Sequence, residues 1–126
     1  MIAATLACGV SLRAGMALRR SRRFRTPRAR GLRERHLWVA KRAVVAILIG
    51  FLAGPVSAVW LRDWEPIRTF HSVAAILAAS LFVGAAVLGK RLESGATRAF
   101  DAHALLGLLA MLVAVVAGVA GFVLLP

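Results

Sequence analysis

Histidine is the one residue type in this chain whose chemistry and position suggest a functional site. The three histidines are His36, His71 and His103. His71 and His103 each lie near the end of a long apolar stretch, and His36 comes just before the first such stretch. Ionisable groups inside membrane helices mark candidate functional sites, because they are costly to place in lipid. We therefore take His71 and His103 as candidate cofactor-binding residues, with a capping or interfacial role as the alternative.

Signatures of other chemistries are absent from the sequence. The apolar stretches contain no Asp, Glu, Lys or Arg, which argues against a proton-coupled carrier or an ion pump. There are no paired carboxylates, no cysteine cluster and no glycine-rich phosphate loop. His71 and Ser72 are neighbours, but adjacent helical residues point about 100° apart and cannot act as base and nucleophile. We expect no enzymatic activity, no catalytic residues and no metal-ion site.

The spacing of His71 and His103 excludes one arrangement of ligands. We expect them at opposite ends of two antiparallel helices, which separates them by roughly 25 Å at 1.5 Å per residue. The two axial ligands of one haem lie only about 4 Å apart across the iron. A haem would need His71 to pair with a histidine of another subunit. Alternatively, His103 would pair with His36 or with another subunit.

Three long stretches without acidic or basic residues must position these histidines. They run from Ala43 to Leu61, from Thr69 to Gly89 and from Ala102 to Pro126. Each is close to the roughly 20 apolar residues that a helix needs to cross a bilayer. Of the 126 residues, 60% are hydrophobic, and the mean hydropathy is +0.79. The sequence predicts an all-α, three-helix transmembrane bundle with spans at about 43–61, 69–89 and 102–125.

A basic N-terminal arm, residues 1–38, precedes the transmembrane domain at residues 39–126. The formal net charge is +12, and twelve basic side chains against one acidic one fall within residues 1–42. We expect residues 1–33 to be disordered; an organelle transit peptide and a start at Met16 stay open. Such an arm is attracted to anionic lipid head groups, and we expect no specific nucleic-acid partner.

Basic residues are more frequent on the arm's side of the spans than on the other side. Because cytoplasmic segments of membrane proteins are enriched in Lys and Arg, we expect a cytoplasmic N-terminus and a C-terminus outside. The predicted location is the cell inner membrane, with an organelle membrane as the alternative. A short turn containing Pro66 should join the first two spans as an antiparallel pair.

Small residues recur every four positions in two of the spans. These stripes are Ala46, Gly50, Gly54 and Ala58 in the first span, and Ala110, Ala114 and Gly118 in the third. In lipid, helices associate through close packing at small residues. We expect the stripes to pack the helices together or to bind another subunit, so that the chain is a homo-oligomer or part of a larger membrane complex. Pro55 should kink the first span.

The second and third spans also resemble a known family. The similarity is carried by Phe70-His71-Ser72, by Gly89-Lys90-Arg91-Leu92 and by the run from Asp101 through His103 to Leu109. Over about residues 70–125 the chain resembles small cytochrome-b561-like proteins and uncharacterised multi-helix membrane proteins with a His-x-x-x-Gly motif. His103 and Gly107 match that motif. The resemblance implies haem b held by histidines near helix ends, although this chain has three histidines rather than the usual four.

Two functions follow from these observations. The first is a non-catalytic accessory or scaffold subunit of a membrane complex, with no cofactor. The alternative is a haem b-binding electron-transfer subunit that uses His71 and His103, with its ligands completed by a partner chain. An absorption spectrum of the extracted protein separates the two.

Overall fold

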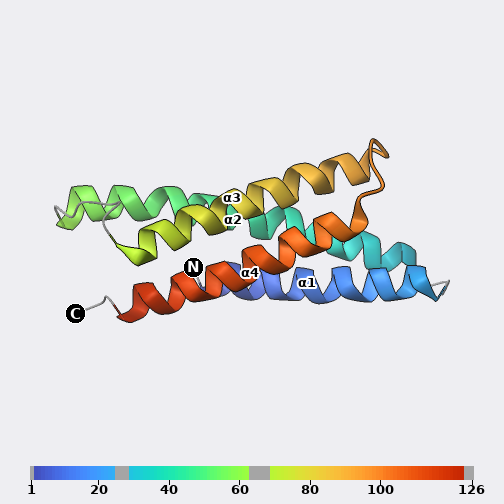
Figure 1. Ribbon diagram of the computed structural model, residues 1–126, viewed down its shortest axis with the longest axis horizontal. Helices are drawn as coiled ribbons and strands as arrows, with labels where there is room; N and C mark the ends of the chain where they lie inside the picture. Colours follow the sequence, from blue (N-terminus) through green and yellow to red (C-terminus); the bar gives the residue numbers. More distant parts are fainter. Residues whose placement is uncertain (1, 25–28, 63–68, 124–126) are drawn as a thin grey trace.

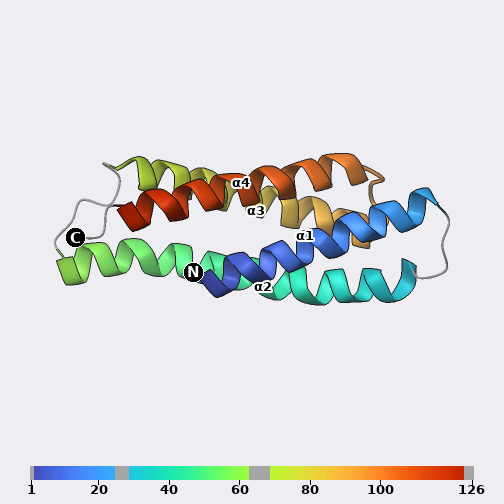
Figure 2. The same ribbon diagram turned by 90° about the horizontal axis from the view of Figure 1, so that it is seen from below.

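Four long helices make up most of the described part of the chain, which covers residues 2–24, 29–62 and 69–123. In the computed structural model they are α1 (Ile2–Arg23), α2 (Ala29–Arg62), α3 (Phe70–Glu93) and α4 (Phe100–Val123). They lie side by side as an elongated bundle, with successive helices running in opposite directions (Figures 1 and 2). The predicted all-α fold class is confirmed.

Three of these helices are long and apolar enough to cross a membrane. Among the described residues the candidates are Gly31–Ser57 within α2, the whole of α3 and the whole of α4. The number of spans agrees with the prediction from the sequence. However, α2 begins at Ala29, so the expected boundary between arm and membrane domain at residue 38 falls inside a continuous helix. The Arg, Leu, Glu, Lys and Ala residues around this boundary all favour helix.

Residues 2–23 form α1, contrary to the disorder expected for residues 1–33. α1 packs mainly against α2 and also along α4. Its inward face carries small or apolar side chains, of which Cys8 and Ser11 are buried. Arg13, Arg19 and Arg20 are exposed. These arginines suggested disorder, but α1 can pack against its neighbours without burying their charges.

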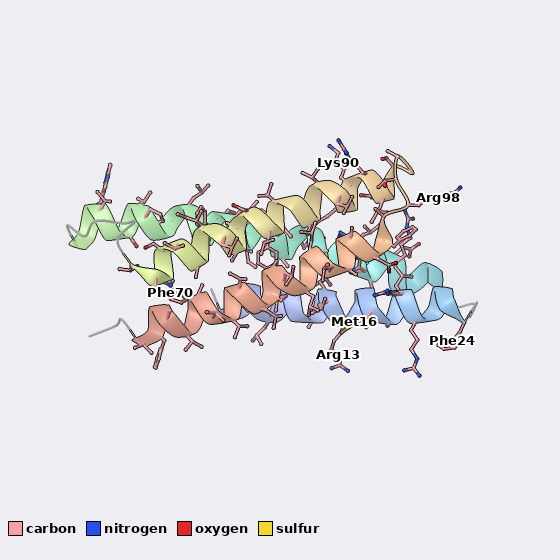
Figure 3. The ribbon with its side chains drawn as sticks, in the orientation of Figure 1. Arg13, Met16, Phe24, Phe70, Lys90 and Arg98 are labelled. Carbon is pink, nitrogen blue, oxygen red and sulfur yellow. The ribbon has the colours of Figure 1, made fainter. Side chains whose placement is uncertain are left out.

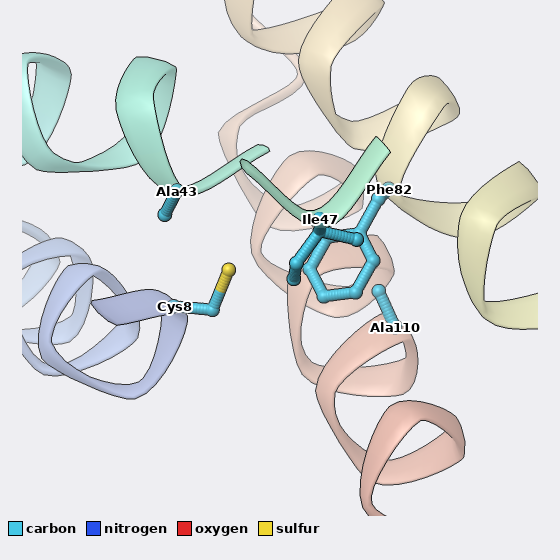
Figure 4. Packing of buried hydrophobic residues seen from close by; sticks show 5 residues of the cluster. All are labelled: Cys8, Ala43, Ile47, Phe82 and Ala110. Atoms are coloured by element: carbon cyan, nitrogen blue, oxygen red, sulfur yellow. The ribbon is translucent and has the colours of Figure 1, made fainter. Parts of the chain in front are cut away.

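A small core joins all four helices near the middle of the bundle. Its residues are Cys8 of α1, Ala43 and Ile47 of α2, Phe82 of α3 and Ala110 of α4 (Figure 4). Three of these side chains are very small, and Ala110 has no exposed surface. Small side chains allow helices to approach closely, which is the main source of helix association in lipid.

The bundle consists of two helix pairs, α1 with α2 and α3 with α4, that meet along α1–α4 and α2–α3. Two ion pairs join the helix pairs. Arg19 Nη2 lies 2.6 Å from Asp101 Oδ1, and Lys41 Nζ lies 2.8 Å from Glu93 Oε1. We call this end, where α1 and α3 finish and α2 and α4 begin, the basic end. Because these charges are largely exposed, the ion pairs add little stability.

The connection between α3 and α4 is fixed by local hydrogen bonds. Gly95 has a φ of +78°, and the amides of Gly95 and Ala96 donate to the carbonyls of Leu92 and Arg91. This is the Schellman arrangement, which requires a left-handed residue and so favours glycine. At its other end, α3 is capped by Thr69, whose side chain accepts a hydrogen bond from the Ser72 amide.

The small-residue stripes lie only partly inside the bundle. On α2, Ala46 and Gly54 are exposed and Gly50 is half-buried. Ala43 and Ile47 are buried on nearly the same side of the helix, whereas Gly54 lies in the stretch 52–57, which is exposed on every side. On α4, Ala110 is buried, Ala114 packs against the core and Gly118 is exposed. Pro55 lies within α2. The Ala58 side chain and the turn at residues 63–66 lie outside the part of the structure that is described.

We predict that Cys8 is protected from thiol reagents in the folded protein. Cys8 is the one cysteine in the sequence, and it is only 6% exposed, so modification reports the packing of α1 directly. N-ethylmaleimide should react slowly with the protein in mild detergent and rapidly after unfolding in SDS.

A matched control is the Cys8→Ser, Met16→Cys double variant, because Met16 lies on the same helix and is 54% exposed. Its thiol should react rapidly in the folded protein. Equal rates at the two positions in mild detergent would contradict the packing of α1.

Candidate functional site

Two histidines meet at the basic end of the bundle. His36 of α2 and His103 of α4 have ring centroids 6.1 Å apart, and their planes are inclined by 82°. Both side chains are half-buried. They come from different helix pairs, so the rings lie where the two pairs meet. The sequence suggested this pairing as one of the alternatives for His103.

Backbone carbonyls of the neighbouring helices orient both rings. His36 Nδ1 lies 3.0 Å from the carbonyl oxygen of Ser11 on α1, and His103 Nδ1 lies 3.0 Å from that of Ala85 on α3. A carbonyl only accepts hydrogen bonds, so Nδ1 is the donor in both rings. In the neutral imidazole this leaves the Nε2 lone pair available for a ligand. The Ser11 hydroxyl oxygen makes a second contact with His36 Nδ1, at 3.3 Å.

A glycine lies beneath each of these rings. A Cβ atom on Gly15 would lie 3.2 Å from His36 Cε1, and one on Gly89 would lie 3.1 Å from His103 Cε1. Both distances are tighter than ordinary carbon contacts. Gly15 lies four positions after Ser11, whose carbonyl accepts from His36. Gly89 likewise lies four positions after Ala85, whose carbonyl accepts from His103. Since residues four apart share a helix face, carbonyl and glycine together form the surface on which each ring lies.

His71 repeats the arrangement at the opposite end of the bundle. Its Nδ1 lies 2.8 Å from the carbonyl oxygen of Ala117 on α4. A Cβ on Gly121, four residues further on, would lie 2.8 Å from its ring. His71 and His103 thus pack against opposite ends of the α3–α4 pair, as their spacing predicted. No second histidine accompanies His71 within the described ranges.

Sequence reasoning identified the histidines but missed the residues that hold them. Ser11 and Gly15 lie in the segment that was expected to be disordered, so no contact with His36 was anticipated. Gly89 was noted only within the run that carries the family resemblance, and Gly121 was not identified as a partner of histidine. The signal in the sequence was a glycine on the neighbouring antiparallel helix opposite each histidine. Which glycine faces which histidine can be identified only when the register of the two helices is known.

The rings of His36 and His103 form a steep, edge-to-face pair. Their centroid separation of 6.1 Å lies within the roughly 4.5–7 Å of edge-to-face ring contacts. Two imidazoles that bind the same metal would also have centroids roughly 6 Å apart, because each nitrogen lies about 2 Å from the metal and each ring centre about 1 Å behind it. A direct hydrogen bond between the rings would bring the centroids about 1 Å closer. The separation is therefore compatible with a ring contact and with a shared metal, and it is longer than a direct hydrogen bond gives.

His36 and His103 provide too few ligands for a bare structural zinc ion. Structural zinc sites use four protein ligands, whereas the described residues contain no group of three or more His, Cys, Asp or Glu that could hold a metal. Haem supplies four nitrogen ligands itself and needs only axial ligands from the protein. At this pair, the Nε2 atoms of His36 and His103 would supply them, because both Nδ1 atoms are hydrogen-bonded to carbonyls.

We predict opposite effects of alanine at two glycines of α4. Gly121→Ala places a methyl group 2.8 Å from the His71 ring and should destabilise the bundle by about 1–3 kcal/mol through overpacking. Gly118→Ala meets nothing within 4 Å, so the better helix propensity of alanine should stabilise it by about 0.5–1 kcal/mol. Unfolding by SDS in mixed micelles, followed by circular dichroism, measures both. If the two variants have the same stability, the contact of Gly121 with His71 is not formed.

Comparison with known proteins adds no assignment to this geometry. No protein-family model, curated protein or solved structure matches the chain. The resemblance of residues 70–125 to cytochrome-b561-like proteins stays a prediction, and the function is argued from the histidines themselves.

Proposed function

We propose that this chain is a membrane-embedded haem b electron-transfer subunit in which His36 and His103 would hold the haem. The observation that carries the proposal is the pair of neighbouring rings, with centroids 6.1 Å apart and with Nδ1 of each hydrogen-bonded to a carbonyl. Bound haem would supply reversible one-electron chemistry. In this proposal one chain provides both ligands, whereas the sequence suggested completion by a partner.

Two features of the chain support such a site. The carbonyls of Ser11 and Ala85 fix the tautomer and the direction of each ring, a role that outer-shell groups commonly play for metal-bound histidines. Gly15 and Gly89 allow the rings to lie against α1 and α3, so that the rings remain apart at the centre. α1 is therefore part of the site, although the sequence suggested a separate arm.

The distribution of charge supports a cytoplasmic basic end. Exposed basic side chains of α1, α2, α3 and the α3–α4 loop gather there, namely Arg19, Arg20, Arg33, Arg35, Lys41, Arg42, Lys90, Arg91 and Arg98. Lys and Arg are enriched on the cytoplasmic side of membrane proteins. In this orientation α4 ends at the outer face. α1 runs along α2 in the opposite direction, so its first described residues lie away from the basic end (Figure 2).

We predict that the protein extracted in mild detergent shows the Soret and α bands of haem b after reduction. His36→Ala and His103→Ala should each abolish the six-coordinate spectrum. His71→Ala is the matched control and should retain it, because His71 lies at the other end. Since the ring planes are 82° apart, the ferric form should give a strongly anisotropic low-spin EPR signal. A colourless protein, both as extracted and after addition of haemin, would refute the proposal.

A second candidate function, the accessory or scaffold subunit, is supported by the exposed stripe on α2. Ala46 and Gly54 are exposed, and a Cβ on Gly54 would meet nothing within 4 Å. Exposed small residues are the surfaces at which membrane helices dock. This role is compatible with haem binding, since electron-transfer subunits must contact their partners.

We predict that Gly54→Leu releases the chain from its oligomer or complex without changing the visible spectrum. The leucine side chain would hold a docking helix away from α2. Gly31→Leu is the control, because Gly31 also has open space around it but lies near the start of α2, outside the stripe. Light scattering coupled to gel filtration in mild detergent gives the mass. An unchanged mass for Gly54→Leu would argue against docking at this stripe.

A further inference from the structure

The outer face of α1 is not used by the bundle or by the histidine pair. Arg13, Met16, Arg20 and Phe24 are spaced by three and four residues, which places them on one face of the helix. Met16 is 54% and Phe24 65% exposed, and both arginines are exposed. Arg13 and Phe24 extend away from the other helices (Figure 3). This face alternates cationic and apolar side chains.

A shallow hollow lies on this face near the basic end. It has a volume of about 370 Å³ and is lined by Met16, Arg19, Arg20 and Phe24. The guanidinium of Arg19 is neutralised by Asp101, 2.6 Å away. Arg20 has no ion-pair partner in the part of the chain that the structure describes. The hollow therefore combines one unneutralised guanidinium with two apolar side chains.

The position of the hollow matches the boundary of a membrane. Its Arg19 contacts Asp101 in the first turn of α4, so the hollow lies level with the start of a candidate span. At the same end of the bundle, Trp38 is 59% exposed and the Arg42 guanidinium lies 3.9 Å from its ring centroid. Tryptophan prefers the level of the lipid head groups. The ligand expected at this level carries an anionic group joined to an apolar chain.

We propose that the hollow on α1 binds an anionic phospholipid. The Arg20 guanidinium donates hydrogen bonds to the phosphate, which its planar donor geometry suits. Met16 and Phe24 pack against the glycerol and the first methylene groups. Long-range attraction comes from the excess of basic side chains at this end. The site is independent of the histidine pair, which lies on the opposite face of α1.

The test uses the full chain in phosphatidylcholine vesicles that contain a trace of spin-labelled phosphatidylglycerol or of spin-labelled phosphatidylcholine. The motionally restricted fraction of each label gives the selectivity for the anionic lipid. Arg20→Gln should remove most of this selectivity. Arg98→Gln is the matched control: it makes the same charge change at the basic end, on a side chain that extends away from the bundle (Figure 3), and should leave most of the selectivity.

Three results would overturn the proposal. An equal loss of selectivity in Arg20→Gln and Arg98→Gln would assign the attraction to diffuse surface charge. Full selectivity in a Met16→Ser, Phe24→Ser double variant would remove the apolar half of the site. Displacement of the labelled phosphatidylglycerol by inorganic phosphate would indicate a site for free phosphate. Slow reaction of Cys8 with N-ethylmaleimide in every variant confirms that α1 remains packed.

Discussion

The bundle depends on one contact that occurs three times: a histidine Nδ1–H donated to a backbone carbonyl, with the ring lying over a glycine four residues further along the same helix. A polar ring between apolar helices must find its hydrogen bond inside the protein, because lipid offers none. The helix carbonyl can accept this additional bond through its second lone pair. A side chain at the fourth position would crowd the ring at Gly15 and Gly89 and would clash with it at Gly121. Histidine and glycine are therefore coupled requirements in this fold.

This contact also sets the relative position of the helices within each pair. His36 joins α2 to α1, and both His71 and His103 join α3 to α4. The α3–α4 pair is fixed at both ends, whereas the α1–α2 pair has such a contact at the basic end only. Two rings face each other there, and His71 has no counterpart at the other end among the described residues. The chemistry of the bundle is accordingly concentrated at one end.

Much of the fold could be predicted because it follows from single-helix properties. The absence of charge in the apolar stretches predicts three spans, and helix geometry places His71 and His103 at opposite ends. α1 could not be predicted in this way. Its arginines resemble a disordered basic arm when read alone, and the helix is stabilised by contacts with α2 and α4. The residues that hold His36 were missed for the same reason, since Ser11 and Gly15 both lie on α1.

The small-residue stripe of α2 illustrates a second limit of sequence reasoning. The spacing of Ala46, Gly50 and Gly54 correctly identifies a common helix face, but it carries no information about what that face contacts. In the structure Ala43 and Ile47, on nearly the same side of α2, belong to the four-helix core, whereas Gly54, further along the helix, lies in the exposed stretch 52–57. α1 has two faces of different character: one holds His36, and the other carries arginines and apolar side chains. When a helix has two functional faces, spacing defines each face, and only the packing of its neighbours decides which one remains available to lipid or to another chain.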